Sequence, residues 1–391
     1  MDVSMQQKVE RMKRLFDEEQ KRQSMARAID DLPTSFELIS DEWLTRTVCR
    51  NVSGAQVMSH SLDVADEGTS NRRRIFLQYN DVGKKAALPA SVFCKATQSL
   101  QSRFILGLND VAEAEVTFYN HVRPLLDIEA PKGIFANIDR ESLNSIVILK
   151  DMKGYAEFCD ERTEITLARS KSQMRLLARV HGKFQDNPAL RPVLERFQTF
   201  VEFYGKTEAA IGWNACQRRG LQAARHLLPA NLAERVDDIG GLTERAFLSH
   251  ARLPVTLLHS DVHLKNWYVA ATGEMGLMDW QVLTQGNGIR DLAYAISTAL
   301  TVEDRRAWEM DLIRYYLERL KEEAGATPSF DDALTLYRQQ LFCALAMWTT
   351  ALAPPEGAPM MQPPETALKF IDRMAHAIDD LDAWDASAPM S

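Results

Sequence analysis

The sequence predicts an α+β protein with two lobes, a small β-rich N-terminal lobe and a larger, mainly helical C-terminal lobe. Two observations predict this fold class. Before residue 150, aromatic and branched residues recur near every second position, which is typical of strands. After residue 150, apolar residues recur at helical spacing. We therefore expect a helical extension at residues 1–34, a first lobe at 35–152 and a second lobe at 153–391.

The elements of the first lobe follow from short stretches of sequence. The charged residues 1 to about 30 place Val9, Met12, Leu15 and Phe16 on one helical face, which indicates an amphipathic helix or else a frayed tail. The stretches "RRRIFLQYN" and "ASVFCKA" predict strands, and "DVGKKAALP" predicts the turn between them. A helix, "NDVAEAEVTFYNHVRPLL", and a further strand, "SLNSIVILKDM", complete the order strand, strand, helix, strand.

The second lobe is predicted to be helical on both sides of a polar segment. Helical spacing marks "ITLARSKSQMRLLARVHGKFQ", "RPVLERFQTFVEFYGKTEAAIGW" and "GLTERAFLSHARL". The stretches "LLHSDVHLKNWYV" and "GLMDWQVLTQ" come next, and helices resume from about residue 290. A proline-rich break, "APPEGAPMMQPP", separates the last two helices.

Composition excludes several classes of function. The 391 residues are 46% hydrophobic and carry a net charge of -8, without a basic region that would favour a nucleic-acid partner. No apolar run approaches the roughly 20 residues that a membrane span needs. The start of the chain does not resemble a secretory signal, and the five cysteines are scattered. These features predict a cytoplasmic protein with reduced thiols.

The segment "LLHSDVHLKNWYV" combines polar residues with a strand-like apolar pattern, and three interpretations compete. His259, Asp261 and His263 alternate, so on an extended segment they would point the same way and could bind zinc. Such sites need further ligands, and only His376 follows among the eight histidines of the chain. A polar turn without chemistry is the second interpretation.

The third interpretation is phosphoryl transfer. Asp261 and Asn266 have the spacing of the loop H-R-D-x-x-x-x-N, in which the Asp receives a hydroxyl proton and the Asn holds magnesium. Asp279, at the end of the next apolar strand, supplies a second oxygen ligand of the kind that Mg²⁺ prefers. The sequence thus predicts Asp261 as the catalytic base, and Asn266 and Asp279 as ligands of Mg²⁺ bound with ATP or another nucleoside triphosphate.

Phosphoryl transfer of this kind also needs a strand lysine that is paired with a helix glutamate. Lys95 ends the strand "SVFCK", and the next helix offers Glu113 and Glu115. A lysine at a strand end is usually a solvated edge charge. The ordered set of lysine, glutamate, Asp–Asn loop and second Asp is much harder to obtain by chance.

These motifs resemble those of the aminoglycoside phosphotransferase and choline kinase superfamily, and they are most similar to its ecdysteroid-kinase-like (CHK kinase-like) branch. In that branch the loop reads H-G-D-x-H-x-x-N and the next strand ends in D-W-Q. A later D-x-A-Y is matched by Asp291 to Tyr294, and E-x-x-F-Y is matched by residues 115–119, which favours Glu115 as the partner of Lys95. The resemblance runs from about residue 40 to the C-terminus. It implies a protein-kinase-like fold of two lobes.

The resemblance also implies roles for residues of the nucleotide site. The loop over the phosphates is expected at Gly68, Thr69 and Ser70, where small residues let backbone N–H groups approach phosphate although G-x-G-x-x-G is absent. Backbone groups of Lys150 and Met152, after the third strand, are expected to hold the adenine.

Four further residues of the motifs have expected roles. His263 is expected to contact phosphate or to fix Asp261, and His259 to act as a structural hydrogen-bonding residue. Asp291 is expected to order the loop through backbone hydrogen bonds. Ser260 replaces the glycine that is common in the family, and a small side chain there is expected to be harmless.

The acceptor is expected to be a small molecule, because the short segment between Asp279 and Asp291 has no room for a peptide-docking activation segment. Acidic residues of the later helices alternate with Arg and Lys, which disfavours a pocket for a polycation. Aromatic residues at 195–215 form either core or an apolar acceptor wall. We expect transfer to a hydroxyl of a fairly apolar molecule. The alternatives are an aminoglycoside or choline-type kinase, or a non-catalytic kinase-like nucleotide- or metabolite-binding protein.

Overall fold

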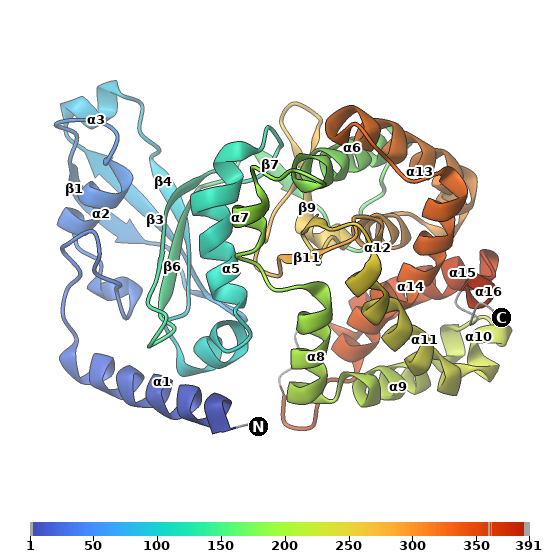
Figure 1. Cartoon of the computed structure of the whole chain (residues 1–391). Coiled ribbons are helices and arrows are strands. Elements are labelled where there is room, and N and C mark those ends of the chain that lie inside the picture. Colours follow the sequence, from blue (N-terminus) through green and yellow to red (C-terminus); the bar gives the residue numbers. More distant parts are fainter. Residues whose placement is uncertain (1–2, 359, 361, 387–391) are drawn as a thin grey trace. The chain divides into compact units, whose positions relative to one another are not determined.

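The computed structural model describes residues 3–358, 360 and 362–386 (Figure 1). The chain divides into two compact units. Unit 1 comprises Met1–Leu125 and Pro131–Gly154, and unit 2 comprises Leu126–Ala130 and Tyr155–Ser391. Unit 1 holds an antiparallel sheet and unit 2 is mainly helical, so the expected α+β fold class is confirmed.

The sheet of unit 1 has the strand order β1-β3-β4-β6-β5, with β2 paired to β3, and every pairing is antiparallel. The strands are β1 (Val57–Leu62), β2 (Asp66–Glu67), β3 (Asn71–Tyr79), β4 (Ser91–Ala96), β5 (Gly133–Ile138) and β6 (Ser145–Lys150). The three strands predicted from sequence are β3, β4 and β6. The strands β1 and β5, whose burial is mixed and whose apolar pattern is weak, and the two-residue β2 were not predicted.

The core of unit 1 forms where α2 (Asp41–Val48) packs on the sheet. Ser40 caps this helix by accepting the Trp43 N–H at 3.1 Å. The Trp43 ring is fully buried and meets Phe135 edge-on at 5.6 Å, while its indole N–H donates to the Asp31 carbonyl. The stretch predicted as a plain turn forms a short helix, α3 (Asp81–Lys85), because Asn80 accepts the Gly83 N–H and caps it.

The charged N-terminal segment forms α1 (Val3–Arg22), which confirms the amphipathic helix. Met12 is buried, and Glu19 pairs with Arg103, whose guanidinium also lies over the Phe16 ring. Arg103 is itself buried and donates to the Thr97 carbonyl at 3.0 Å. The helix is therefore docked on the segment that joins β4 to the next helix.

That next helix changes its geometry along its length. It begins as α5 (Val111–Thr117), continues as the π-helical turn η3 (Phe118–Val122) and ends in the 3-10 turn η4 (Arg123–Leu125). Before it lie α4 (Leu100–Ser102) and the π-helical turn η2 (Arg103–Gly107). The sequence predicted the helix but not these changes of winding.

Unit 2 contains eleven α-helices and five short strands among its described residues. The helices are α6 (Leu167–Phe184), α7 (Arg191–Leu194), α8 (Phe200–Ile211), α9 (Trp213–Ala223), α10 (Ala230–Glu234), α11 (Val236–Ser249), α12 (Ile289–Ala299), α13 (Val302–Ala324), α14 (Phe330–Leu352), α15 (Pro364–Asp380) and α16 (Ala383–Ala386). The strands are β7 (Ala156–Phe158), β8 (Thr256–Leu258), β9 (Trp267–Ala270), β10 (Met275–Leu277) and β11 (Thr284–Gly286). They form the sheets β10-β9-β7 and β11-β8.

The stretch "RPVLERFQTFVEFYGKTEAAIGW" has helical spacing throughout, but it does not form one continuous helix. The chain forms α7, α8 and the start of α9 there. Thr199 and Glu202 make a reciprocal capping box, which begins α8 after a break. Gly212 then adopts a left-handed φ of +62° and ends α8. Local capping chemistry thus overrides the continuous apolar period.

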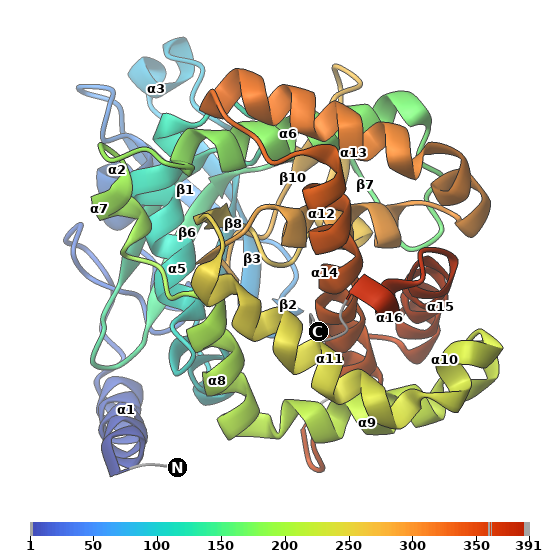
Figure 2. The same ribbon diagram turned by 45° about the vertical axis from the view of Figure 1, so that its right-hand side comes forward.

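The helices of unit 2 pack around a buried α12. Both views show α6 lying along α13 (Figures 1 and 2). The α9–α14 crossing requires glycine, because a Cβ at Gly220 would lie 2.0 Å from the Thr349 carbonyl oxygen. All residues of α12 are buried, and α14 and α15 pack on it. Among the helices that the structure describes, none is both long and apolar enough to cross a membrane.

Candidate active site

Unit 1 supplies a buried ion pair. Lys95 on β4 places its Nζ 2.7 Å from Oε1 of Glu115 on α5. The two residues are 9% and 5% exposed, so little water screens their attraction. Glu113 instead pairs with Arg140 at 2.7 Å. The expected ion pair is therefore confirmed, and so is the choice of Glu115 over Glu113.

The expected phosphate loop lies in the hairpin between β2 and β3. The Gly68 N–H donates to the Ser70 carbonyl at 3.1 Å, and Ser70 is buried. A Cβ at Gly68 would come within 2.8 Å of the Arg72 guanidinium, which is the end of a flexible side chain. Thr69 lies between Gly68 and Ser70 in the turn of this hairpin. A phosphate-binding role for these residues stays a prediction.

The end of β6 carries Lys150, Asp151 and Met152. Asp151 accepts from Arg74 Nε at 2.6 Å and from Ser91 Oγ at 2.6 Å. Burial raises the pKa of Asp151, but the hydrogen bonds from Arg74 and Ser91 outweigh it and lower the pKa on balance. Asp151 therefore links the end of β6 to β3 and β4. Lys150 is exposed and Met152 half-buried, and their contact with adenine stays a prediction.

In unit 2 the segment 259–266 joins β8 to β9 as a loop with an unusual backbone. Ser260 has a φ of +67°, a left-handed conformation that costs a non-glycine residue about 1–2 kcal/mol. Its hydroxyl lies 2.8 Å from that of Thr284, and its N–H donates to Asp291. This geometry explains why glycine suits the position and how a serine is accommodated.

Asp291 orders the loop from the start of α12. It is fully buried and accepts the backbone N–H groups of His259 at 2.7 Å and of Ser260 at 3.2 Å. Burial raises the pKa of its carboxyl, but His181 and Arg290 outweigh that effect and lower the pKa to about 2. The expected structural role of Asp291 is confirmed.

His259 uses both ring nitrogens inside the chain. Its Nδ1 accepts the Asp261 N–H at 3.2 Å, so its Nε2 carries the proton that faces the Met278 carbonyl at 3.0 Å. Burial lowers its pKa, in keeping with a neutral ring. The expected structural role of His259 is confirmed, and neither nitrogen is left for zinc. The described residues contain no group of three or more His, Cys, Asp or Glu arranged to hold a metal.

Asp261 and Asn266 are joined directly. The Asn266 amide donates to the Asp261 carbonyl at 2.7 Å and to its carboxylate at 3.2 Å. Burial raises the pKa of Asp261, but His263 and His259 outweigh that effect and lower it on balance. The carboxylate is therefore ionised at neutral pH, as a proton acceptor must be. Its side chain is 20% exposed, which leaves one side open.

Asp279 follows the hairpin of β9 and β10, with a φ of +63°. Leu277 pairs with Trp267, and the Met278 N–H donates to the Asn266 carbonyl at 2.9 Å. The hairpin thus returns the chain to the level of Asn266. An Asp279 carboxylate and an Asn266 carboxamide oxygen are hard donors of the kind that Mg²⁺ takes, so these two residues fit the expected metal. Their role as ligands stays a prediction.

His263 lies beside Asp261 and not in an open position. Its Nε2 is 3.5 Å from an Asp261 carboxylate oxygen. Its ring meets Trp348 edge-on at 5.1 Å and packs on Phe370. Of the two roles expected for His263, this geometry favours the contact with Asp261.

Three of the tryptophans and most of the aromatic residues at 195–215 are core. Trp213, Trp267 and Trp280 are buried and donate to backbone carbonyls, as expected for packing residues. Phe200 and Tyr204 are buried against Phe247. Of the two interpretations of the 195–215 residues, this packing supports core, because their helical face turns to α11 and α14.

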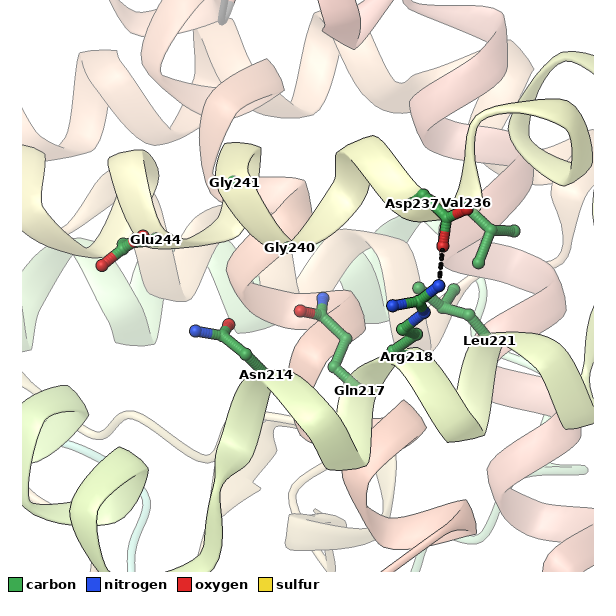
Figure 3. A pocket seen from close by; sticks show the side chains of 9 residues that line it. All are labelled: Asn214, Gln217, Arg218, Leu221, Val236, Asp237, Gly240, Gly241 and Glu244. Atoms are coloured by element: carbon green, nitrogen blue, oxygen red, sulfur yellow. Dashed lines mark ion pairs between the residues drawn. The ribbon is translucent and has the colours of Figure 1, made fainter.

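Unit 2 has two hollows, the first of mixed lining and the second mainly polar. One, of about 260 Å³, lies between α9 and α11, where Gln217 of α9 lies opposite Gly240 and an Arg218–Asp237 ion pair of 2.8 Å closes one end (Figure 3). The other, of about 370 Å³, is lined by residues 127–129, by α6 and by β10. Leu221 and Val236 give the first hollow an apolar part, whereas charged side chains dominate the second.

Sequence reasoning missed one group at the site. The Tyr294 hydroxyl lies 3.4 Å from Oδ1 of Asp261. The signal was present in D-x-A-Y, because residues 291 and 294 are three apart and share a helical face. The same face of α12 therefore carries Asp291, which orders the loop, and Tyr294, which contacts Asp261 in the loop.

Comparisons with known proteins agree with this fold. The chain belongs to the ecdysteroid kinase-like family, whose model matches residues 65–327. A protein of Ralstonia eutropha JMP134, described as a candidate aminoglycoside phosphotransferase, has a TM-score of 0.52 and 12% identity, over 89% of this chain and 96% of that one. A microcompartment-associated aminopropanol kinase has a TM-score of 0.51 and 15% identity, over 85% and 95%.

A third match is wild-type aminoglycoside 2'-phosphotransferase-IIIa in its GDP complex, with a TM-score of 0.49 and 10% identity, over 89% of this chain and 100% of that one. A search of curated proteins finds no match. The family and the fold define a kinase-like protein.

Proposed function

We propose that the protein is a phosphotransferase that moves the γ-phosphate of ATP, or of another nucleoside triphosphate, to a hydroxyl group of a small molecule. The observation that carries the proposal is the placement of the Asp261 carboxylate, which is partly exposed and accepts the Asn266 amide N–H at 3.2 Å. The descriptions of the matched structures, an aminoglycoside phosphotransferase and an aminopropanol kinase, support transfer to a small molecule.

In the proposed reaction the acceptor oxygen bonds to the γ-phosphorus, and the bond to the β,γ-bridging oxygen breaks. Asp261 orients the hydroxyl and takes its proton, and the nucleoside diphosphate leaves. Asn266 and Asp279 would hold Mg²⁺, which would offset phosphate charge. The loop network of Asp291 and His259 keeps Asp261 in place without reorganisation during transfer.

Unit 1 handles the nucleotide in this proposal. Lys95, oriented by Glu115, pairs with phosphate oxygens. Backbone N–H groups of residues 68–70 approach the phosphates, and backbone groups at Lys150 and Met152 hold the base. A cytoplasmic location also belongs to the proposal, supported by five buried cysteines that are free thiols.

The proposed acceptor is neutral and fairly apolar. A polycation would need several uncommitted carboxylates, because its ammonium groups must be paired once removed from water. Carboxylates of the later helices are already engaged: Arg305 pairs with Glu309 at 2.7 Å, and Arg306 pairs with Asp380 at 2.7 Å. Arg305 also pairs with Asp380, so two arginines occupy the acidic C-terminal run at that point.

The test is nucleotide consumption with Mg²⁺ against hydroxylated steroids, terpenoid alcohols, choline and kanamycin-type aminoglycosides. We expect turnover with an apolar alcohol, and loss of metal-dependent nucleotide binding in Asp279→Asn. Asp237→Asn, 74% exposed on α11, is the matched control. Turnover of aminoglycosides without turnover of alcohols would contradict the acceptor. Nucleotide binding without turnover of any acceptor would identify a non-catalytic binding protein instead.

A further inference from the structure

The Asp261 carboxylate is contacted at both of its oxygens. Oδ1 lies 3.4 Å from the Tyr294 hydroxyl. Oδ2 lies 3.2 Å from the Asn266 amide and 3.5 Å from Nε2 of His263. Asn266 and His263 belong to the loop itself, and Tyr294 reaches the carboxylate from α12. Together they define one orientation of the carboxylate.

Tyr294 offers a hydroxyl that packing does not require. The ring is fully buried and lies under Arg290, with 4.7 Å between the guanidinium carbon and the ring centre. A phenylalanine would fill the same space. A buried hydroxyl costs free energy unless it is hydrogen-bonded, and Asp261 accepts this one. The Trp348 indole N–H also faces the hydroxyl, but no hydrogen bond closes between them.

His263 is fixed by packing on one side and faces Asp261 on the other. Trp348 and Phe370 hold its ring, and its Nδ1 is buried without a hydrogen-bond partner among the described residues. The ring is therefore not oriented through Nδ1, as a purely structural histidine usually is. Its polar contact is made by Nε2, at Asp261.

We propose that Tyr294 and His263 are positioning residues that hold the Asp261 carboxylate from its two oxygens, in the orientation in which it meets the acceptor hydroxyl. This inference rests on the proposed function. Neither side chain needs to touch nucleotide or acceptor. Their loss should therefore slow the transfer step without weakening nucleotide binding, because small misplacements of a reacting group cost rate.

The first test is Tyr294→Phe, which removes one oxygen atom and keeps the ring. We expect kcat to fall roughly tenfold, with the KM for nucleotide unchanged. The matched control is Tyr337→Phe, which removes a buried hydroxyl that donates to the buried Glu309 carboxylate at 2.8 Å. That control should keep its kcat. A Tyr294→Phe protein with the kcat of the control would overturn the assignment of Tyr294.

The second test separates the polar and packing roles of His263. His263→Gln keeps an N–H near the place of Nε2, whereas His263→Phe keeps a ring against Trp348 and Phe370. Positioning predicts that the Gln variant retains more kcat than the Phe variant. A structural role predicts the reverse order, and that order would overturn the assignment of His263.

Crystal structures of the same variants distinguish failure of this inference from failure of the proposed function. If wild-type protein turns over no acceptor, the proposed function fails, and the orientation of Asp261 is still measurable. We expect the carboxylate to rotate in Tyr294→Phe and His263→Phe and to stay in place in Tyr337→Phe. An unchanged Asp261 in all three would overturn the inference even if the enzyme is active.

Discussion

The Lys95–Glu115 pair of unit 1 and the Asp261 loop of unit 2 are built in different ways. Lys95 and Glu115 are brought together by a strand and a helix, whose connecting segment is held by α1 through Arg103. The Asp261 loop is held through its own backbone, by His259 inside the loop and by the buried Asp291 at the start of α12. The first arrangement is one side-chain ion pair between two elements, and the second is a set of backbone hydrogen bonds.

This difference predicts which property a substitution should impair in each part of the proposed active site. An ion pair between two elements is lost when either one shifts, so its failure should appear as weaker nucleotide handling. A loop tied to a buried carboxylate cannot loosen without leaving a charge unpaired, so its failure should appear first as lost stability. Substitutions of Lys95 and of Asp291 should therefore separate nucleotide binding from folding.

Among substitutions that compare the two units, Lys95→Met is expected to have the largest effect on nucleotide affinity or turnover. Lys95→Met keeps much of the side chain and removes the charge, so nucleotide affinity or turnover should fall about 10- to 100-fold, because the phosphates lose a cation. Isothermal titration and steady-state kinetics measure it. Lys85→Met, exposed on α3 of the same unit, is the control. Unchanged affinity and turnover in Lys95→Met would remove Lys95 from the nucleotide site.

Asp291→Asn is expected to act on folding. The substitution leaves Arg290, which is fully buried, without its carboxylate at 3.1 Å. Breaking a buried pair in this way costs about 3–5 kcal/mol. Urea unfolding measures the loss, with the exposed pair variant Asp237→Asn expected within about 0.5 kcal/mol of wild type. A small loss at Asp291 would show that the loop does not depend on this carboxylate.

His250 predicts how the stability of unit 2 changes with pH. Burial lowers its pKa to about 4, although Gln340 and Asp291 favour its charged form and Arg290 opposes it. The folded protein therefore favours the neutral form of the His250 ring. Stability should be full above about pH 6.5 and should fall as pH drops toward 4, by roughly 3 kcal/mol at most. His259, whose pKa is also lowered, acts in the same direction.

Unfolding measured at several pH values tests this prediction. His250→Gln removes the titrating group and should flatten the slope between pH 6.5 and 4. His226→Gln, which changes an exposed histidine, should leave the slope as it is in the wild type. Equal slopes in all three proteins would show that His250 does not titrate in this range.

The smallest effect is expected at Ser260. Ser260→Gly relieves the left-handed strain but loses the contact with Thr284 and makes the unfolded chain more flexible, so the terms nearly cancel, to within about 1 kcal/mol. Turnover should stay within about twofold of wild type. Ser260→Val, branched at a left-handed position, should destabilise clearly. A large loss of turnover in Ser260→Gly would give the hydroxyl a role in the reaction.

Sequence patterns predicted the parts whose chemistry requires fixed spacing. The Asp261–Asn266 spacing and Asp279 after a hairpin are set within one short segment. The Lys95–Glu115 pair is visible as a strand-end lysine followed by E-x-x-F-Y on the next predicted helix. The amphipathic α1 and the central strands were predictable because their apolar periods are strong.

Other features depended on contacts that a local pattern does not contain. The break between α7 and α8 is decided by the Thr199 capping box, which competes with an unbroken apolar period. The spacing of the aromatic residues of α8 is equally compatible with a core and with a pocket wall. Their packing against Phe247 is what favours the core. Tyr294 reaches Asp261 across 33 positions of sequence.

The central claim is that Asp261 accepts the proton of an acceptor hydroxyl during transfer of a nucleotide phosphate. Asp261→Asn keeps the shape of the side chain and removes the carboxylate. Phosphoryl transfer to the acceptor, measured by rapid quench alongside the affinity of the same variant for the magnesium nucleotide, tests the claim most directly. The account predicts at least a ~100-fold slower transfer with nucleotide affinity largely kept. Transfer at a near wild-type rate in Asp261→Asn would contradict it.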